Sequence, residues 1–193
     1  YLYGFILIVF PIIYTIIAAN NLVARHVDKG SMAYLLATPN TRVKVASTQA
    51  LYLVASVTLL MALITVVLIG LSEAMFPGLL KIGRFIRWNA VTFLILLVVA
   101  GISFLSSCIF NDAKTSLAFG AGIPILFVLF KMVADISEKV EFFKYFTLYT
   151  LLNTDKVLND NGYVLTISLI LIAASAVLYS FGVFIFNKKS LAI

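Results

Sequence analysis

The sequence predicts an all-α polytopic membrane protein with five transmembrane helices and short interfacial helices. Its 193 residues are 63% apolar or aromatic and only 11% charged. A soluble domain carries about 45–50% apolar and about 25% charged residues, so the apolar excess must face lipid. The charges also fall in clusters, and the stretches between them approach or exceed the ~20 apolar residues that cross a bilayer.

These charge-free stretches place five spans within a single domain, 1–193. We expect the spans at approximately 2–20, 48–72, 88–110, 115–134 and 162–186. The fourth span is long enough because Lys131, one turn from its end, can extend its ammonium to the headgroups. Residue 1 already lies in an apolar run without an initiator methionine, so we expect the natural chain to begin earlier, with a further span before this one.

The first span contains Pro11, which removes a backbone hydrogen bond and predicts a kink. The connection that follows, 23–47, has the pattern of a short helix: Gly30 breaks the incoming chain, Ser31 can cap free N–H groups, and Pro39 forces an end. Apolar side chains with i, i+3, i+4 spacing lie on one side of it, namely Met32, Leu35 and Leu36. Two isolated turns are unstable in water, so this helix needs a surface, either lipid or a partner protein.

The connection after the second span, 73–87, predicts an interfacial amphipathic helix over 77–88. Three cations gather in one sector of this helix, opposite most of its apolar side chains: Lys81, Arg84 and Arg87. Trp88 marks the membrane interface. We expect the cations to bind lipid phosphates, and a contact with substrate is the alternative. The last connection, 136–160, is rich in aromatic residues, which predicts either an interfacial belt or a re-entrant element.

The third and fourth spans are expected to form an antiparallel hairpin, because the turn between them, 111–114, is very short. Small residues let membrane helices approach closely, and these two spans offer such residues at Gly101, Ser116 and Gly120. Gly122 and Pro124 make the first half of the fourth span able to bend.

Catalytic and nucleic-acid-binding classes are disfavoured by what the sequence lacks. The segment 78–83 has the glycine spacing of a phosphate-binding loop, but the Lys-Ser/Thr pair that follows the second glycine in such loops is missing. A single cysteine, Cys108, and a single histidine, His26, argue against a disulfide framework and against a metal cluster. We therefore expect no catalytic residue, no metal and no cofactor. The net charge of +6 lies at the ends of spans, where anionic membrane lipids are better partners than nucleic acid.

The loop cations give only slight support for one orientation in the membrane, because they divide almost evenly between its two sides. With 23–47 in the cytoplasm, the cytoplasmic cations are Arg25, Lys29, Arg42, Lys44, Lys114, Lys188 and Lys189. The outer cations are then Lys81, Arg84, Arg87, Lys139, Lys144 and Lys156. This orientation makes 73–87 and 136–160 the outer interfacial segments.

The segment 20–42 resembles the cytoplasmic segment of bacterial type-2 ABC exporter permeases, in which an acid and a glycine precede Leu-Leu-x-x-Pro and an arginine. The matching residues here are Asp28, Gly30, Leu35, Leu36, Pro39 and Arg42. The hairpin 101–114 and the ending 186–191 also resemble that family, so the similarity covers nearly the whole chain.

This resemblance implies a permease with six spans, of which the first is missing here, in the bacterial cytoplasmic membrane. It also implies a dimer with a second permease copy or a homologous permease, and a separate ABC ATPase that docks on the cytoplasmic segment. The expected coupling residues are therefore Asp28, Gly30, Ser31, Met32, Leu35, Leu36, Pro39 and Arg42. Two classes stay open as alternatives: a secondary transporter or channel, and a non-transporting membrane anchor or immunity protein.

Overall fold

The structure is a computed structural model, which describes residues 2–32, 41–134, 136, 142, 145 and 147–189. Every element among these residues is helical. The helices are α1 (Leu2–Leu22), α2 (Ala24–Asp28), α4 (Arg42–Met75), α5 (Ile82–Ile109), α6 (Ala113–Ala134), the 3-10 helix η2 (Leu148–Leu151), α7 (Thr154–Asn159) and α8 (Asn161–Lys188). In this part of the chain, five helices are long and apolar enough to cross a membrane. The predicted fold class is confirmed.

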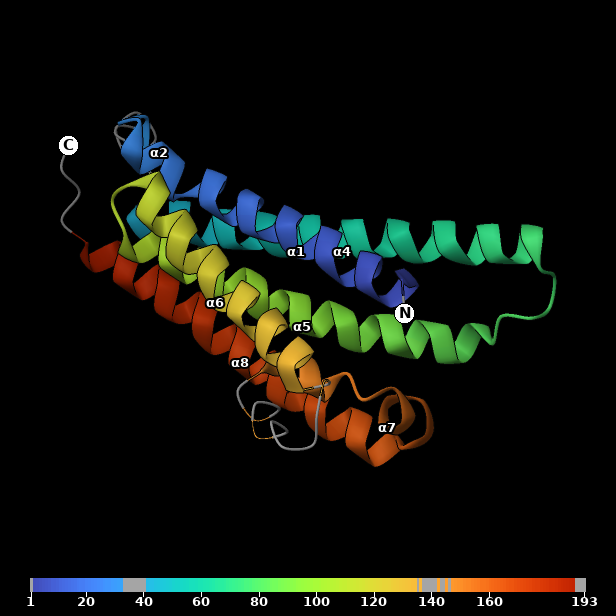
Figure 1. Ribbon diagram of the computed structural model, residues 1–193. Helices are drawn as coiled ribbons and strands as arrows, with labels where there is room; N and C mark the ends of the chain where they lie inside the picture. Colours follow the sequence, from blue (N-terminus) through green and yellow to red (C-terminus); the bar gives the residue numbers. More distant parts are fainter. Residues whose placement is uncertain are drawn as a thin grey trace.

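Helix α5 forms the centre of the bundle, and the other four long helices, α1, α4, α6 and α8, pack around it (Figure 1). In its most apolar stretch, 67% of the residues are buried inside the protein, against 17% to 44% in the other four. The buried core accordingly includes Ile95, Val99, Phe104 and Cys108 of α5. The outer helices turn much of their apolar surface away from the core, as helices in contact with lipid do.

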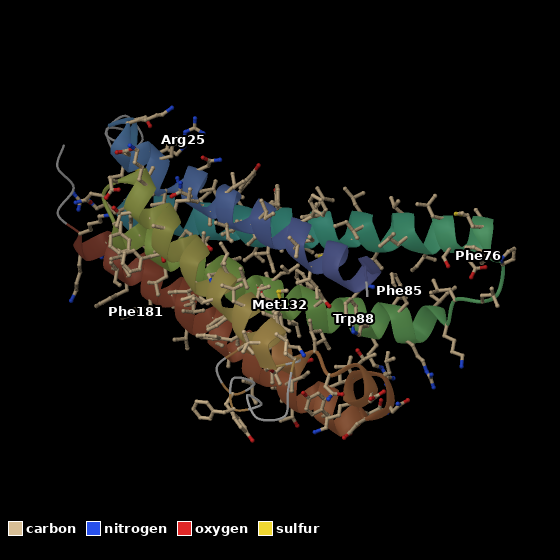
Figure 2. The ribbon with its side chains drawn as sticks, viewed as in Figure 1. Arg25, Phe76, Phe85, Trp88, Met132 and Phe181 are labelled. Atoms are coloured by element: carbon tan, nitrogen blue, oxygen red, sulfur yellow. The ribbon has the colours of Figure 1, made fainter. Side chains whose placement is uncertain are left out.

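The two ends of the bundle carry different sets of loops (Figure 1). At one end lie α2, the start of α4, the turn between α5 and α6, and the end of α8. The connection from α4 to α5 and helix α7 lie toward the opposite end, and Figure 2 shows Arg25 and Phe76 at these two ends. The described cations that the sequence assigns to the cytoplasmic and outer sides are therefore separated by the length of the bundle.

Two helices begin at positions that differ from those expected. Helix α4 starts at Arg42, where the Thr41 hydroxyl accepts a hydrogen bond from the Lys44 N–H at 3.2 Å and caps the first turn. The separate interfacial helix expected over 77–88 is instead a turn around Gly78, which has φ +76°, followed by the start of α5 at Ile82. The physical reason is that no helix breaker separates 82–87 from the span that follows, so the two form one continuous helix. Arg84, Arg87 and Trp88 therefore lie in the first turns of α5.

Candidate functional site

The chain between α1 and α4 folds back at Gly30, which has φ +69°, a left-handed conformation that favours glycine. Helix α2 precedes this turn, and its last residue, Asp28, is exposed. The Ser31 hydroxyl donates to the His26 carbonyl at 3.2 Å and lies 2.9 Å from His26 Nδ1. Ser31 thus ties the turn back to α2. Leu35, Leu36 and Pro39 lie outside the described residues.

Met32 occupies a different place from the one expected. The sequence places it on a partner-facing side with Leu35 and Leu36, but its side chain is only 2% exposed and belongs to the protein's own hydrophobic core. The amphipathic pattern cannot distinguish a residue that faces a partner from one that faces the chain's own helices. Met32 thus packs against the bundle at the end of this turn, and its role in coupling stays a prediction.

Arg42 joins the start of α4 to the end of α8. Its guanidinium Nη1 donates to the Lys189 carbonyl at 2.7 Å. The Lys189 ammonium in turn donates to the Phe110 carbonyl at 2.5 Å, at the C-terminal end of α5. Free carbonyls at a helix C-terminus favour a cation. We call Arg42, Lys189 and Phe110 the end clamp, because these three residues connect the ends of α4, α8 and α5.

The electrostatics of the end clamp follow from its partial burial. Burial lowers the pKa of Lys189, while the nearby Asp112 carboxylate acts in the opposite direction. Asp112 lies in the exposed turn between α5 and α6, and its Oδ1 accepts a hydrogen bond from the Thr115 N–H at 2.6 Å. That hydrogen bond lowers the pKa of Asp112. The turn therefore holds a carboxylate close to a partly buried ammonium.

The chain matches the family model described as "ABC-2 family transporter protein" over residues 4–191. The chain belongs to the ABC-2 transporter family. The resemblance seen in the sequence is thereby confirmed, and the chain is a multi-pass membrane protein and a permease of an ABC transporter. Membership in this family implies partnership with an ABC ATPase. No curated protein and no solved structure matches the chain.

Within this ABC-2 permease, Ser116 and Gly120 of α6 lie against α5. The Ser103 hydroxyl donates to the Gly120 carbonyl at 2.8 Å, and the Ser107 and Ser116 hydroxyls are 3.1 Å apart. A Cβ atom added at Gly120 would lie 3.2 Å from Ser103 Cα. The two backbones therefore approach so closely that hydroxyl groups bond directly between them.

The other residues assigned to packing or bending occupy varied positions. A Cβ at Gly101 would lie 3.0 Å from Leu178 Cβ of α8, whereas one at Gly122 would meet nothing within 4 Å. Pro124 is buried within α6. Pro11 lies inside α1, which runs continuously from Leu2 to Leu22.

Lys189 and Phe110 are the parts of the end clamp that the sequence did not indicate. The pattern at the chain end, two adjacent lysines, predicts a cationic stop after the last span and no specific partner. The carbonyl that Lys189 contacts lies 79 positions earlier in the chain. A hydrogen bond from a side chain to a backbone carbonyl leaves no residue-type signal at the acceptor position, so only the fold reveals it.

Proposed function

We propose that the chain is the membrane permease subunit of an ATP-driven exporter of the bacterial cytoplasmic membrane. The observation that carries this proposal is the family match over residues 4–191. It works as a dimer with a second permease copy or a homologous permease, and a separate ATPase supplies the energy.

The ATPase docks on the connection between α1 and α4. This connection carries the family-like motif of Asp28, Gly30, Leu35, Leu36 and Pro39. Within this part of the chain, Asp28 is exposed, and the exposed Arg25 of α2 precedes the motif. Leu35 and Leu36 supply the apolar contact with the ATPase, while buried Met32 fixes the base of the segment.

The end clamp offers a route from this docking segment to the helices. A force on the segment reaches Arg42 at the start of α4, and Arg42 is bonded to the end of α8. Lys189 then connects α8 to the end of α5, the central helix. Closure of the ATPase pair would therefore displace these three helix ends together and change their tilt. Such a rigid-body motion is one of the usual ways in which transporters alternate access.

The outer helices leave apolar surface for a second permease and for lipid. Helix α4 is the clearest case, since exposed apolar side chains follow one another along it: Leu51, Leu59, Leu63, Val66 and Leu71. In a dimer, part of such a face is covered by the partner subunit and the rest by acyl chains.

Docking is tested by the variant Leu35→Asp in a complex purified through a tag on the permease. Burying a leucine side chain contributes ~1.5–3 kcal/mol, and ~1.4 kcal/mol corresponds to one decade in affinity. We expect ATPase recovery and cargo-stimulated hydrolysis to fall at least about tenfold. The control Lys29→Ala, which removes one exposed charge, should leave both unchanged. Normal recovery and hydrolysis with correctly inserted Leu35→Asp would show that the segment rests on lipid.

The source of ATP hydrolysis is tested separately. Because the sequence lacks a phosphate-loop motif, the purified full-length permease should neither bind nor hydrolyse ATP. Hydrolysis should appear only when the ATPase subunit is added. Saturable ATP binding by the isolated permease, measured by calorimetry, would contradict the proposal.

A further inference from the structure

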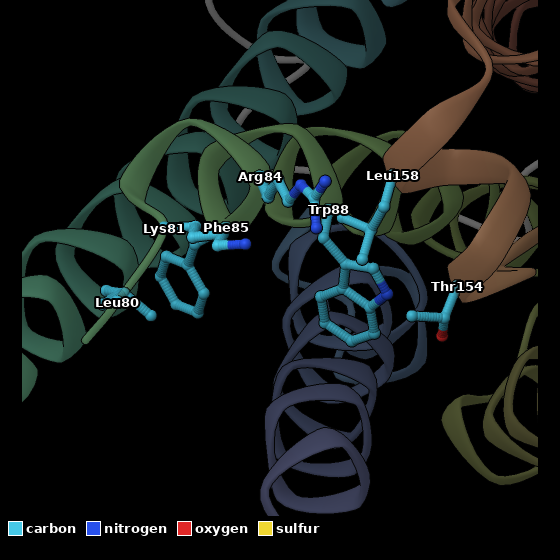
Figure 3. A pocket seen from close by; sticks show the side chains of 7 residues that line it. All are labelled: Leu80, Lys81, Arg84, Phe85, Trp88, Thr154 and Leu158. Carbon is cyan, nitrogen blue, oxygen red and sulfur yellow. The ribbon is translucent and has the colours of Figure 1, made fainter.

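A groove of about 360 Å³ lies between the start of α5 and helix α7, at the end of the bundle opposite the end clamp (Figure 3). One wall is a single face of α5 and its N-cap, with Lys81, Arg84, Phe85 and Trp88 at i, i+3, i+4 and i+7. Leu158 of α7 lines the other side. The groove thus combines two cations with an apolar, aromatic lining.

The two cations in the groove are available to a ligand. Within the described residues, no side-chain hydrogen bond or ion pair involves Lys81 or Arg84, and both residues are exposed. The neighbouring Arg87 differs, because its guanidinium donates to the Leu158 carbonyl at 3.3 Å and so holds α7 against α5. Figure 3 shows the side chains of Lys81, Arg84, Phe85 and Trp88, which all line the groove.

Three described acids of the adjoining segments, Glu73, Asp155 and Asp160, are not among the residues that line the groove. Glu73 accepts a hydrogen bond from the Gly78 N–H at 3.2 Å, and Asp160 caps α8 by accepting one from the Tyr163 N–H at 3.0 Å. Asp155, in the first turn of α7, is exposed and is not among the residues that line the groove. Among the described residues, the lining of the groove therefore carries two cations and no acid.

We propose that this groove binds one anionic phospholipid of the surrounding membrane, whose phosphate contacts Lys81 and Arg84. The upper part of an acyl chain lies along Phe85, Trp88 and Leu158. Cations at a membrane interface attract anionic headgroups, and tryptophan is enriched at the same depth. The apolar lining favours a lipid over free phosphate, because free phosphate would leave that lining exposed to water. The assignment does not depend on the proposed transport function.

Trp88 makes the test specific, because it is the only tryptophan of the chain and it lines the groove. The full-length protein is reconstituted into phosphatidylcholine vesicles that contain brominated phosphatidylglycerol or, in a parallel sample, brominated phosphatidylcholine. Bromine on an acyl chain quenches tryptophan fluorescence on contact. We expect stronger quenching by the anionic lipid at equal mole fraction. Equal quenching by the two lipids would overturn the proposal.

The double variant Lys81→Gln/Arg84→Gln should lower the preference for the anionic lipid about tenfold or more, because both cations that attract the phosphate are removed. The matched control is Lys156→Gln, which removes an exposed cation of α7 that does not line the groove. An equal loss in the control would mean a diffuse surface charge and would overturn the proposal. Displacement of the lipid by inorganic phosphate would overturn it as well, since it would identify a simple anion site.

Discussion

Close contact between α5 and α6 depends on single residues, and Gly120 is the most restrictive of them. A Cβ there would lie 3.2 Å from the Ser103 backbone, whereas a Cβ at Gly122 on the same helix meets open space. Two glycines two positions apart thus serve different purposes. The sequence assigned Gly120 to close packing with a neighbouring helix and Gly122 to bending, but it could not say which helix Gly120 would contact.

The variant Gly120→Leu should separate α5 from α6. Overpacking of a tight contact costs about 1–3 kcal/mol, so we expect the free energy of unfolding in detergent to fall by that amount. Gly122→Leu is the matched control, and it should change stability by much less. Measurement of both by denaturant titration decides the point, and equal destabilisation would show that the loss of a glycine, rather than the contact with Ser103, matters.

Asp112 gives a second prediction for a single residue. Its pKa is lowered in the folded state by the hydrogen bond from the Thr115 N–H. The unfolded chain therefore binds a proton at higher pH than the folded chain, so this stabilisation is present at neutral pH and is lost as the pH falls through the folded pKa. Asp112→Asn should flatten the acidic side of the plot of thermal stability against pH. An unchanged plot would mean that the cap contributes nothing measurable.

Among the elements, α5 and α8 are connected at their ends by Lys189. We expect Lys189→Met, which keeps the chain length but removes the ammonium, to expose the Phe110 carbonyl. Backbone amides near the end of α5, including that of Phe110, should then exchange hydrogen for deuterium faster. Lys188→Met is the control, since Lys188 is exposed and its ammonium lies over the Phe184 ring at 4.5 Å. Similar exchange in the two variants would show that the end clamp does not hold α5.

The helices also show which features of the fold could be predicted from the sequence. Gaps between charges predicted five spans because only lipid tolerates such long apolar runs, and five of the described helices are long and apolar enough to cross a membrane. The sequence predicted the helix starts less well, since α4 begins at Arg42 and α5 at Ile82, several residues before the apolar stretch of each span. Hydropathy does not report how far a helix continues once it leaves the membrane. The burial of Met32 could not be predicted, because its pattern is the same as that of a surface helix. The bond of Lys189 could not be predicted either, because it joins two segments that are distant in the sequence.

For the whole molecule, the separation of charged loops to the two ends of the bundle allows a direct test of orientation. Loop cations favour either side almost equally, and the expected orientation rests on the likeness of 20–42 to a cytoplasmic segment. Lys29, next to α2, and Lys156, on α7, are both exposed and lie toward opposite ends. The native Cys108 is buried, so it should add little background to thiol labelling.

We therefore expect Lys156→Cys to react with a membrane-impermeant maleimide on intact cells, and Lys29→Cys to react only after the membrane is opened. The physical reason is that each thiol can be reached only from the aqueous phase at its own end of the bundle. Both variants remove one exposed cation, so each serves as the control for the other in expression and insertion. The reverse pattern would place the connection between α1 and α4 outside the cell, where no cytoplasmic ATPase could reach it.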